Sequence, residues 1–197
     1  MTWIDETKWE RTWWGNCVNS YMEEEKQLLY AKKMGLKMYH DGKTPYNFDA
    51  KGRILDIGGG PISLLLKCPH AHGTVIDPCD YPEWIERRYE CAGIDYIVHK
   101  GEDLPILSSI QPGFDEVWIY NVLQHVDNPK TICENALCYG KLIRIFEWID
   151  NGVSPGLPHN LKAEKMDEWL RGMGKVEMLN TPVCKGKCYY GIFVGKK

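Results

Sequence analysis

From residue 51 onward the chain alternates short apolar runs with longer amphipathic stretches. The stretches predict helices at residues 63–67, 82–92 and 129–137. Alternation of this kind implies βαβ units, and therefore a parallel sheet with helices on both faces. The apolar runs predict five strands, at residues 53–57, 73–76, 96–99, 114–120 and 141–147.

The C-terminal part departs from this alternation. Residues 166–173 predict a helix, and residues 176–179 and 189–194 predict two strands joined by a turn rich in glycine and lysine. Two strands joined in this way suit an antiparallel hairpin. The pattern as a whole predicts an α/β fold, a doubly wound and mostly parallel seven-stranded sheet with a C-terminal antiparallel hairpin.

The first fifty residues have a different character, since four of the eight tryptophans fall within the first fourteen positions. A helix is predicted over residues 17–34, with acidic residues near its start and lysines near its end, the order that the helix dipole favours. A turn-rich connection at residues 41–45 follows. We expect residues 1–50 to form an aromatic-rich helical cap within the same domain, and residues 51–197 to form its core.

Composition fits one globular domain of 197 residues, 44% of them hydrophobic and 26% charged. The net charge of −3 lacks the basic excess typical of nucleic-acid binding, so we expect no nucleic-acid partner. No apolar run is long enough to span a bilayer, and the N-terminus lacks the pattern of a secretory signal. We therefore expect a cytoplasmic protein without membrane insertion; the sequence leaves its oligomeric state open.

The eight cysteines are scattered, and only Cys184 and Cys188 are spaced like a pair of metal ligands. A zinc site needs two further ligands, and the other cysteines form no second close pair. We expect a turn between two strands here and no metal site, with zinc binding as the weaker alternative.

A glycine turn, Gly58-Gly59-Gly60, follows the first of the five strands, an arrangement that lets the backbone approach a nucleotide-like ligand closely. Asp77 ends the next strand about 20 residues on, where a ribose diol is bound in such folds. The alternative for Asp77 is a turn or capping residue ahead of Pro78. The glycine turn upstream favours ribose binding.

Asp56, directly ahead of the turn, bears on which ligand binds. A pyrophosphate fingerprint needs glycine at its first, third and sixth positions, and the sixth counted from Gly58 is Ser63. A carboxylate also sits poorly beside a pyrophosphate, whereas it suits a ligand with an ammonium and a sulfonium group, such as S-adenosylmethionine. The alternative for Asp56 is an acid that caps local backbone amides.

These residues resemble class I S-adenosylmethionine-dependent methyltransferases, particularly the small-molecule type 11 domains similar to ubiquinone and menaquinone C-methyltransferases. The family's acid-x-Gly-x-Gly turn and the acid after its second strand match Asp56 and Asp77 with their neighbours. Its Gly-Glu-Asp-Leu-Pro and Phe-Asp-x-Val…His…Pro stretches match residues 101–105 and 114–129. The chain departs from the family at Ile62, where a further glycine is common, and at residues 138–141, where Pro-Gly-Gly is usual.

The resemblance implies roles for particular residues. Gly58 and Gly60 would pass close to the methionine part of the cofactor, Asp77 would hold the ribose hydroxyls, and Gly101 would lie at the adenine edge. The full set of implied cofactor-binding residues is Asp56, Gly58, Gly59, Gly60, Asp77, Pro78, Gly101, Glu102, Asn121 and Val122.

A sulfonium already activates its methyl group, so the protein has to align the acceptor behind that carbon and exclude water. His125 and His159 follow the fourth and fifth predicted strands and are candidate general bases, because histidine titrates near neutrality; Glu147 is a weaker candidate. Either histidine could instead be an ordinary loop residue. Trp13, Trp14 and Tyr21 are candidate lid residues, with core packing as the alternative.

We therefore expect a methyltransferase that moves a methyl group from S-adenosylmethionine to an O, N or C atom of a small molecule. An NAD(P)-dependent oxidoreductase would share the glycine turn and the ribose acid, but the incomplete fingerprint and Asp56 disfavour it. A non-catalytic S-adenosylmethionine-binding module is a further alternative. DNA amide methylation is disfavoured, because Asn121-Val122-Leu123 stands in place of an Asn-Pro-Pro-aromatic run.

Overall fold

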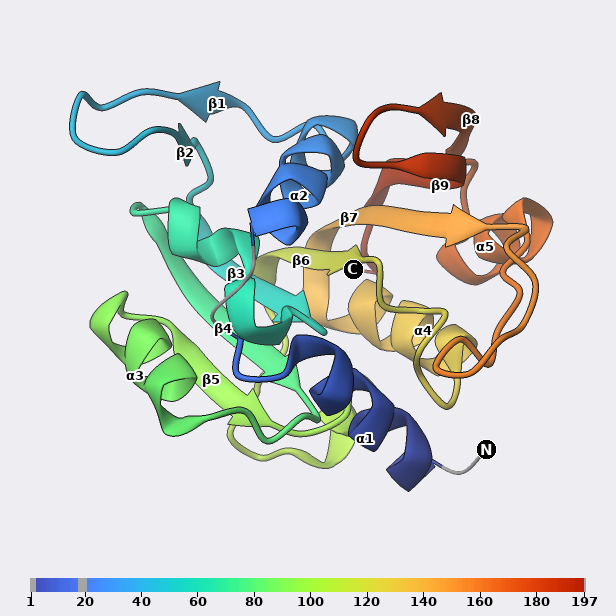
Figure 1. Cartoon of the computed structure of the whole chain (residues 1–197), viewed down its shortest axis with the longest axis horizontal. Coiled ribbons are helices and arrows are strands. Elements are labelled where there is room, and N and C mark those ends of the chain that lie inside the picture. The colour runs from blue at the N-terminus through green and yellow to red at the C-terminus, as the bar shows by residue number, and fades with distance from the viewer. Residues whose placement is uncertain (1–2, 18–20, 197) are drawn as a thin grey trace.

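A computed structural model describes residues 3–17 and 21–196, without the side chains of residues 3–6 and 21. Figure 1 shows a seven-stranded sheet with helices packed against it and a separate two-stranded sheet. In chain order the elements, with η for 3-10 helices, are α1 (Trp3–Trp14), α2 (Tyr21–Lys33), β1 (Met38–Tyr39), β2 (Asn47–Phe48), β3 (Gly52–Ile57), η1 (Gly60–Ile62), η2 (Leu64–Lys67), β4 (Ala71–Asp77), α3 (Glu83–Cys91), β5 (Asp95–Val98), η3 (Gly101–Ile106), β6 (Phe114–Tyr120), α4 (Pro129–Tyr139), β7 (Gly140–Ile149), α5 (Ala163–Leu170), β8 (Lys175–Asn180) and β9 (Lys185–Val194).

The seven-stranded sheet has the order β5-β4-β3-β6-β7-β9-β8. Strands β5 to β7 are parallel, and β9 lies antiparallel between β7 and β8. The predicted mostly parallel sheet with a C-terminal antiparallel hairpin is therefore confirmed. The chain leaves β3 towards β4 on one side and later returns to β6 on the other. Ligands of open α/β sheets bind at such a switch point, outside the carboxyl ends of the strands.

Two apolar layers cover the two faces of the sheet. One contains buried side chains of α2, η2 and α3, and the other contains those of α4, α5 and η3. Tyr30 of α2 stacks on Phe146 of β7, with 4.3 Å between the ring centroids. Arg144 of β7 donates a hydrogen bond of 2.8 Å to the carbonyl of Met34, at the end of the same helix. Thus α2 packs directly on the sheet, whereas α1 lies across its end (Figure 1).

Two local predictions are wrong. Residues 64–67 form the short 3-10 helix η2 and no α-helix, because β4 begins already at Ala71 and leaves room for little more than one turn. The predicted turn around residues 184–188 lies earlier. The Thr181 N–H donates to the carbonyl of Cys184 at 2.8 Å, and β9 has begun at Lys185.

Cys184 and Cys188 are buried, and no cluster of three or more His, Cys, Asp or Glu side chains suited to a metal ion occurs within the described residues. In the same part of the chain, no helix has both the length and the apolar composition to cross a membrane.

Candidate active site

The glycine turn after β3 adopts a backbone that only glycine accepts easily. Gly58 has φ +74° and Gly60 has φ +60°, both in the left-handed region. A Cβ atom on Gly58 would lie 2.5 Å from Cγ2 of Val122, which follows β6. The turn and the segment after β6 are therefore in direct contact, and a larger residue at position 58 would push them apart.

Asp77 ends β4 beside this turn and is only 5% exposed. Its Oδ2 accepts the N–H of Gly60 at 3.0 Å, and its Oδ1 accepts the N–H of Cys79 at 2.9 Å. Burial raises the pKa of this carboxyl to about 6. The turn role that the sequence left as an alternative is thus present, yet each oxygen keeps a second lone pair that can accept a ligand hydroxyl.

Asp56 lies behind the turn and is fully buried. Its Oδ2 accepts hydrogen bonds from Ser63 at 2.5 Å and from Tyr120 at 2.6 Å. Its Oδ1 has no hydrogen-bond partner within the described residues. Burial raises the pKa of the carboxyl to about 7, in spite of the two hydrogen bonds. Such an orphaned acceptor is costly unless a donor reaches it.

Two buried tyrosines, which sequence reasoning missed, fasten the same turn. The Tyr89 hydroxyl donates to the carbonyl of Gly60 at 2.6 Å and accepts the N–H of Ser63 at 3.0 Å. The Tyr120 hydroxyl, besides its bond to Asp56, accepts the N–H of Leu64. A tyrosine at a core position of a helix or strand indicates a buried hydroxyl that needs a hydrogen-bond partner, but the sequence pattern does not indicate which residue that partner is.

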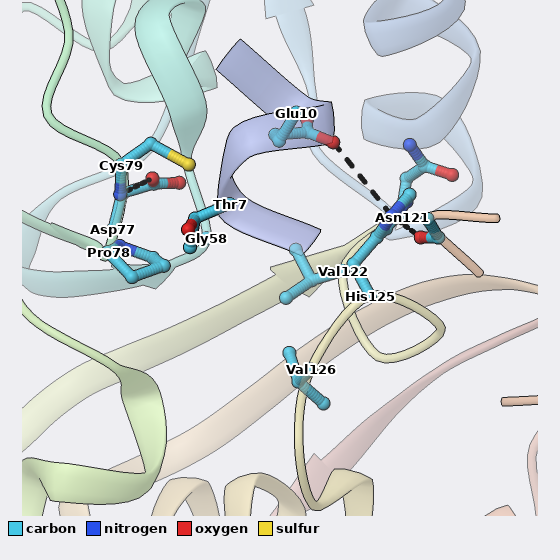
Figure 2. A pocket seen from close by; sticks show the side chains of 11 residues that line it. Thr7, Glu10, Gly58, Asp77, Pro78, Cys79, Asn121, Val122, His125 and Val126 are labelled. Atoms are coloured by element: carbon cyan, nitrogen blue, oxygen red, sulfur yellow. Dashed lines mark hydrogen bonds and ion pairs between the residues drawn. The ribbon is translucent and has the colours of Figure 1, made fainter. Parts of the chain in front are cut away.

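The turn and Asp77 form one wall of a pocket, and the segment after β6 forms the other (Figure 2). The pocket encloses about 500 Å³ of empty space, part of it open to solvent. Among its described lining residues, Glu10 and Asp77 are acidic and none is Lys or Arg. It is lined by Thr7, Glu10, Gly58, Asp77, Pro78, Cys79, Asn121, Val122, His125, Val126 and Gly156.

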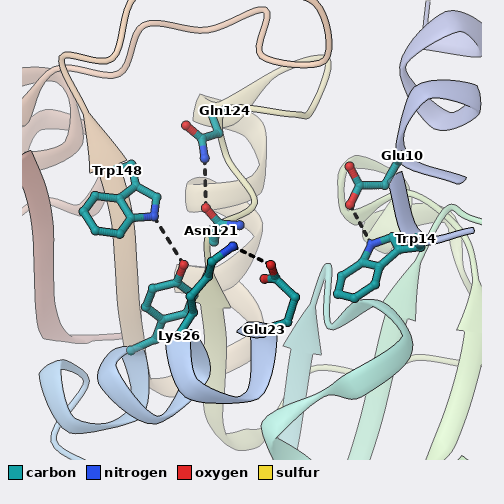
Figure 3. A network of polar contacts seen from close by, with 8 residues as sticks. Glu10, Trp14, Glu23, Lys26, Asn121, Gln124 and Trp148 are labelled. Atoms are coloured by element: carbon teal, nitrogen blue, oxygen red, sulfur yellow. Dashed lines mark hydrogen bonds and ion pairs between the residues drawn. The ribbon is translucent and has the colours of Figure 1, made fainter. Parts of the chain in front are cut away.

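Asn121 begins the second wall with φ +57°, a strained conformation that asparagine tolerates better than most residues. Its N–H still donates to the carbonyl of Phe146 at 2.9 Å, as a continuing strand would. Its side-chain oxygen accepts a hydrogen bond from Gln124, also at 2.9 Å (Figure 3). Local bonds thus hold the chain in the reversal that directs Val122 towards Gly58.

The two candidate histidines are placed differently. His125 lines the pocket, and its Nδ1 lies 2.7 Å from the carbonyl oxygen of Gly156. Because a carbonyl only accepts, Nδ1 carries the hydrogen, and in the neutral ring Nε2 holds the lone pair. His159 lies outside the pocket lining, and its Nε2 is 2.7 Å from the carbonyl oxygen of Val126. The structure therefore brings only His125 to the pocket wall.

Helix α1 contributes an acid that sequence reasoning missed. Glu10 enters the pocket from α1, with Oε2 3.9 Å from Nδ1 of His125 (Figure 2). Its Oε1 accepts a hydrogen bond of 2.8 Å from the Trp14 indole (Figure 3). Burial is the main cause that raises the pKa of Glu10, and the neighbouring Glu23 adds to it. Glu10 faces the site only because α1 lies there, which no local pattern indicates.

The three candidate lid residues also differ in where they lie. Trp14 reaches the glycine turn, where a Cβ on Gly60 would lie 3.9 Å from its Cζ2 atom. Trp13 is 60% exposed and stacks on Trp9 at 5.8 Å between centroids. The Tyr21 side chain lies outside the described residues. Of the two described candidates, only Trp14 is therefore placed near the turn.

Comparison with solved structures identifies the fold. The chain superposes on a Thermotoga maritima protein described as a S-adenosylmethionine-dependent methyltransferase and possible histamine N-methyltransferase, with TM-score 0.64, 13% identity, and 98% and 99% of the two chains covered. It also superposes on 1,6-didemethyltoxoflavin-N1-methyltransferase of Burkholderia thailandensis, solved with S-adenosylhomocysteine, with TM-score 0.61, 13% identity, and 98% and 85% covered. The chain has the class I methyltransferase fold.

A third structure with the methyltransferase fold is the N-methyltransferase NodS of Bradyrhizobium japonicum in complex with S-adenosylhomocysteine, with TM-score 0.60, 14% identity, and 91% and 90% of the chains covered. No family model and no curated protein matches the sequence. The comparison with solved structures thus confirms the methyltransferase fold that the motifs of the chain predict.

Within this methyltransferase fold, the residues expected at the adenine edge lie in η3. The Glu102 carboxylate accepts the N–H of Asn128, just ahead of α4, at 3.0 Å. Gly101 is buried, and a Cβ there would lie 2.6 Å from Cγ2 of Ile57. Neither residue belongs to the pocket lining, and their role in binding adenine stays a prediction.

Proposed function

We propose that this protein binds S-adenosylmethionine and transfers its methyl group to a small-molecule acceptor. The observation that carries this proposal is the charge of the pocket at the switch point. Its described lining residues include two carboxylates and no Lys or Arg. Such a pocket suits a ligand with a sulfonium and an ammonium group, and it opposes a pyrophosphate through like charge.

The residues present fit the cofactor. Gly58 and Gly60 leave room for a close approach of the ligand, and Asp77 has lone pairs for ribose hydroxyls. Asp56 lies behind the turn and outside the pocket lining, so it would act on the ligand only through the glycine turn that it helps to hold. Pro78 and Asn121 lie at opposite walls of the pocket and would flank the two ends of the ligand.

The chemistry asks little of the protein beyond alignment. The sulfonium of the bound cofactor supplies an activated methyl group. Asn121 and Val122 would line the part of the pocket where the methyl acceptor binds. Glu10 and His125 would take up the proton that an O–H or N–H acceptor releases. Glu10 gains basicity from its raised pKa. An O, N or C atom of a small molecule is the proposed acceptor, in a cytoplasmic setting and without nucleic acid.

Two alternatives make different predictions. An NAD(P)-dependent oxidoreductase would need the pocket to accept a pyrophosphate, which its acidic lining opposes. A non-catalytic module would bind S-adenosylmethionine without transferring its methyl group. Because in-line methyl transfer needs no single indispensable side chain, the residues of the pocket do not distinguish an enzyme from such a module.

Calorimetry with S-adenosylhomocysteine and NADH distinguishes a methyltransferase from an NAD(P)-dependent oxidoreductase. We expect micromolar binding of S-adenosylhomocysteine and no response to NADH; the reverse result would overturn the proposal. A cell-lysate screen with radiolabelled methyl donor then separates enzyme from binding module. Label in the small-molecule fraction supports the proposed acceptor class, label only in macromolecules contradicts it, and no label with tight cofactor binding favours the module.

A further inference from the structure

We infer that Glu147, buried beneath the pocket, is a positioning residue that holds the segment after β6 in the shape required for ligand binding. The inference rests on the proposed function in one respect, because the ligand in question is the proposed cofactor. Glu147 lies near the carboxyl end of β7 and is fully buried. It is absent from the pocket lining, so the weaker sequence hypothesis of a general base gives way to a role exerted through the backbone.

One carboxylate oxygen receives two consecutive backbone donors. Oε1 of Glu147 accepts the N–H of Val122 at 2.9 Å and the N–H of Leu123 at 3.0 Å. Strand β6 has ended at Tyr120, so the sheet no longer supplies acceptors for these two groups. A buried N–H without an acceptor costs about 1–3 kcal/mol, which gives Glu147 a strong hold on this segment.

Through the Val122 backbone, the hydrogen bonds of Glu147 affect both walls of the pocket. Asn121, in its left-handed conformation, directly precedes the two amides that Glu147 binds. Val122 in turn packs against Gly58, where no Cβ would fit. A displacement of the Val122 backbone would therefore move the second wall and remove the contact that fixes the glycine turn.

The sequence context supports a specific role for this acid. Glu147 shares one face of β7 with Ile143, Ile145 and Ile149, all of them buried. A fourth aliphatic residue would pack in this row without the cost of burying a carboxyl group, but it would leave the two N–H groups without an acceptor. Oε2 of Glu147 has no hydrogen-bond partner among the described residues, and burial raises the pKa of the carboxyl to about 8. A neutral carboxylic acid fits these observations, because one of its oxygens accepts both N–H groups and no charge is buried.

The test compares four variants with the wild-type protein. E147Q keeps an oxygen acceptor at the same reach, E147L removes it, and E147D shortens the side chain by one methylene. I143A is the matched control, because it cuts the same apolar row away from the pocket. Melting temperatures show that each variant is folded, and E147D carries the test if E147L does not fold.

Two readouts are measured. The first is amide hydrogen exchange of residues 121–126 in the ligand-free protein, and the second is the Kd for S-adenosylhomocysteine. We expect E147L and E147D to exchange faster in this segment and to bind about tenfold more weakly, the effect of roughly one lost hydrogen bond. E147Q should stay within about threefold of wild type in both, and I143A should change neither.

The outcomes separate this inference from the proposed function. If E147L and E147D match I143A in exchange and affinity, Glu147 is only part of the core and the inference is overturned. If E147Q fails as E147L does, an acceptor oxygen is not what matters, which also contradicts it. If the wild type does not bind S-adenosylhomocysteine, the proposed function falls, while the exchange data still decide whether Glu147 positions the segment.

Discussion

The Trp14 indole donates a hydrogen bond of 2.8 Å to the carboxylate of Glu10, four residues earlier on α1. The bond joins an aromatic ring near the glycine turn to an acid in the pocket wall. Because it involves Oε1, the other oxygen of Glu10 is left on the side of His125. Helix α1 thus presents a carboxyl group of fixed orientation to the site.

Replacement of Glu10 should therefore discriminate between charged and uncharged sulfur. S-adenosylmethionine carries a sulfonium charge that S-adenosylhomocysteine lacks, so we expect E10Q to weaken the former about fivefold more than the latter, the effect of about 1 kcal/mol for a partly exposed ion pair. Calorimetry with both ligands measures the ratio. E24Q, at an exposed position of α2, is the control. Equal losses for both ligands would place Glu10 away from the sulfur.

Loss of the Trp14 ring should weaken cofactor binding more than loss of its N–H. We expect about tenfold weaker binding of S-adenosylhomocysteine for W14A and about threefold for W14F, which keeps the aromatic packing but not the hydrogen bond to Glu10. W13A serves as control, because Trp13 is 60% exposed. Unchanged cofactor affinity and unchanged acceptor use in W14A would refute a lid role for this residue.

Alanine at Gly58 should abolish most ligand binding through steric conflict with Val122. The left-handed φ alone costs about 1–2 kcal/mol, and the Cβ would lie 2.5 Å from Cγ2 of Val122. G93A is a matched control, because Gly93 has a similar φ of +69° but open space around it. We expect both variants to lower the melting temperature, and only G58A to reduce affinity for S-adenosylhomocysteine. The double variant G58A/V122A should recover part of that affinity; no recovery would mean that the contact is not what matters.

Removal of the Asp77 carboxylate should cost at least about tenfold in affinity for S-adenosylhomocysteine, since a hydrogen bond to a charged group contributes about 1.5–3 kcal/mol. D77A also leaves the N–H groups of Gly60 and Cys79 without their acceptor, so its melting temperature should fall as well. D80N, at the exposed position three residues on, should leave both quantities unchanged. Full affinity in D77A would restrict Asp77 to its turn role.

Stability should fall as pH rises from about 5 to 8. Burial raises the pKa of Asp77 to about 6, of Asp56 to about 7 and of Glu147 to about 8. Between their unfolded and folded pKa values the folded state binds more protons than the unfolded state, so the unfolding free energy decreases with pH. We expect a decrease of roughly 1 kcal/mol or more per pH unit, measured by urea unfolding.

Single substitutions locate this effect. E147Q should flatten the pH dependence most in the upper part of the range, because Glu147 has the highest of the three pKa values. E86Q, at an exposed position of α3, should leave the slope as in wild type. A stability that rises with pH over this interval would contradict the raised pKa values, because it requires the unfolded state to bind more protons than the folded state.

Local patterns predicted the sheet well because its strands are apolar runs of the expected length. Residues 114–120 were predicted as a strand and form β6 with the same bounds. The short segment after the glycine turn was mistaken for an α-helix, because its leucines fit an α-helix and a 3-10 helix equally well, and only the early start of β4 limits its length.

The site was predictable where a motif lies along the chain, as for Gly58 and Asp77, and not where distant segments meet. Glu10 and His125 are 115 positions apart in number, and their proximity depends on how α1 crosses the sheet. The same holds for Glu147, whose hydrogen bonds join the ends of two neighbouring strands. No residue spacing reports such contacts, because tertiary packing sets them.

The contact between Gly58 and Val122 also has a consequence for assembly of the chain. The two residues belong to different βαβ halves, and the pairing of β3 with β6 brings them together. A fragment that stops before β6 would contain the whole glycine motif and Asp77, yet only one side of the cleft. Contacts between distant segments form late and slowly during folding. Ligand binding therefore requires that both halves of the sheet have come together, and it reports their assembly during synthesis.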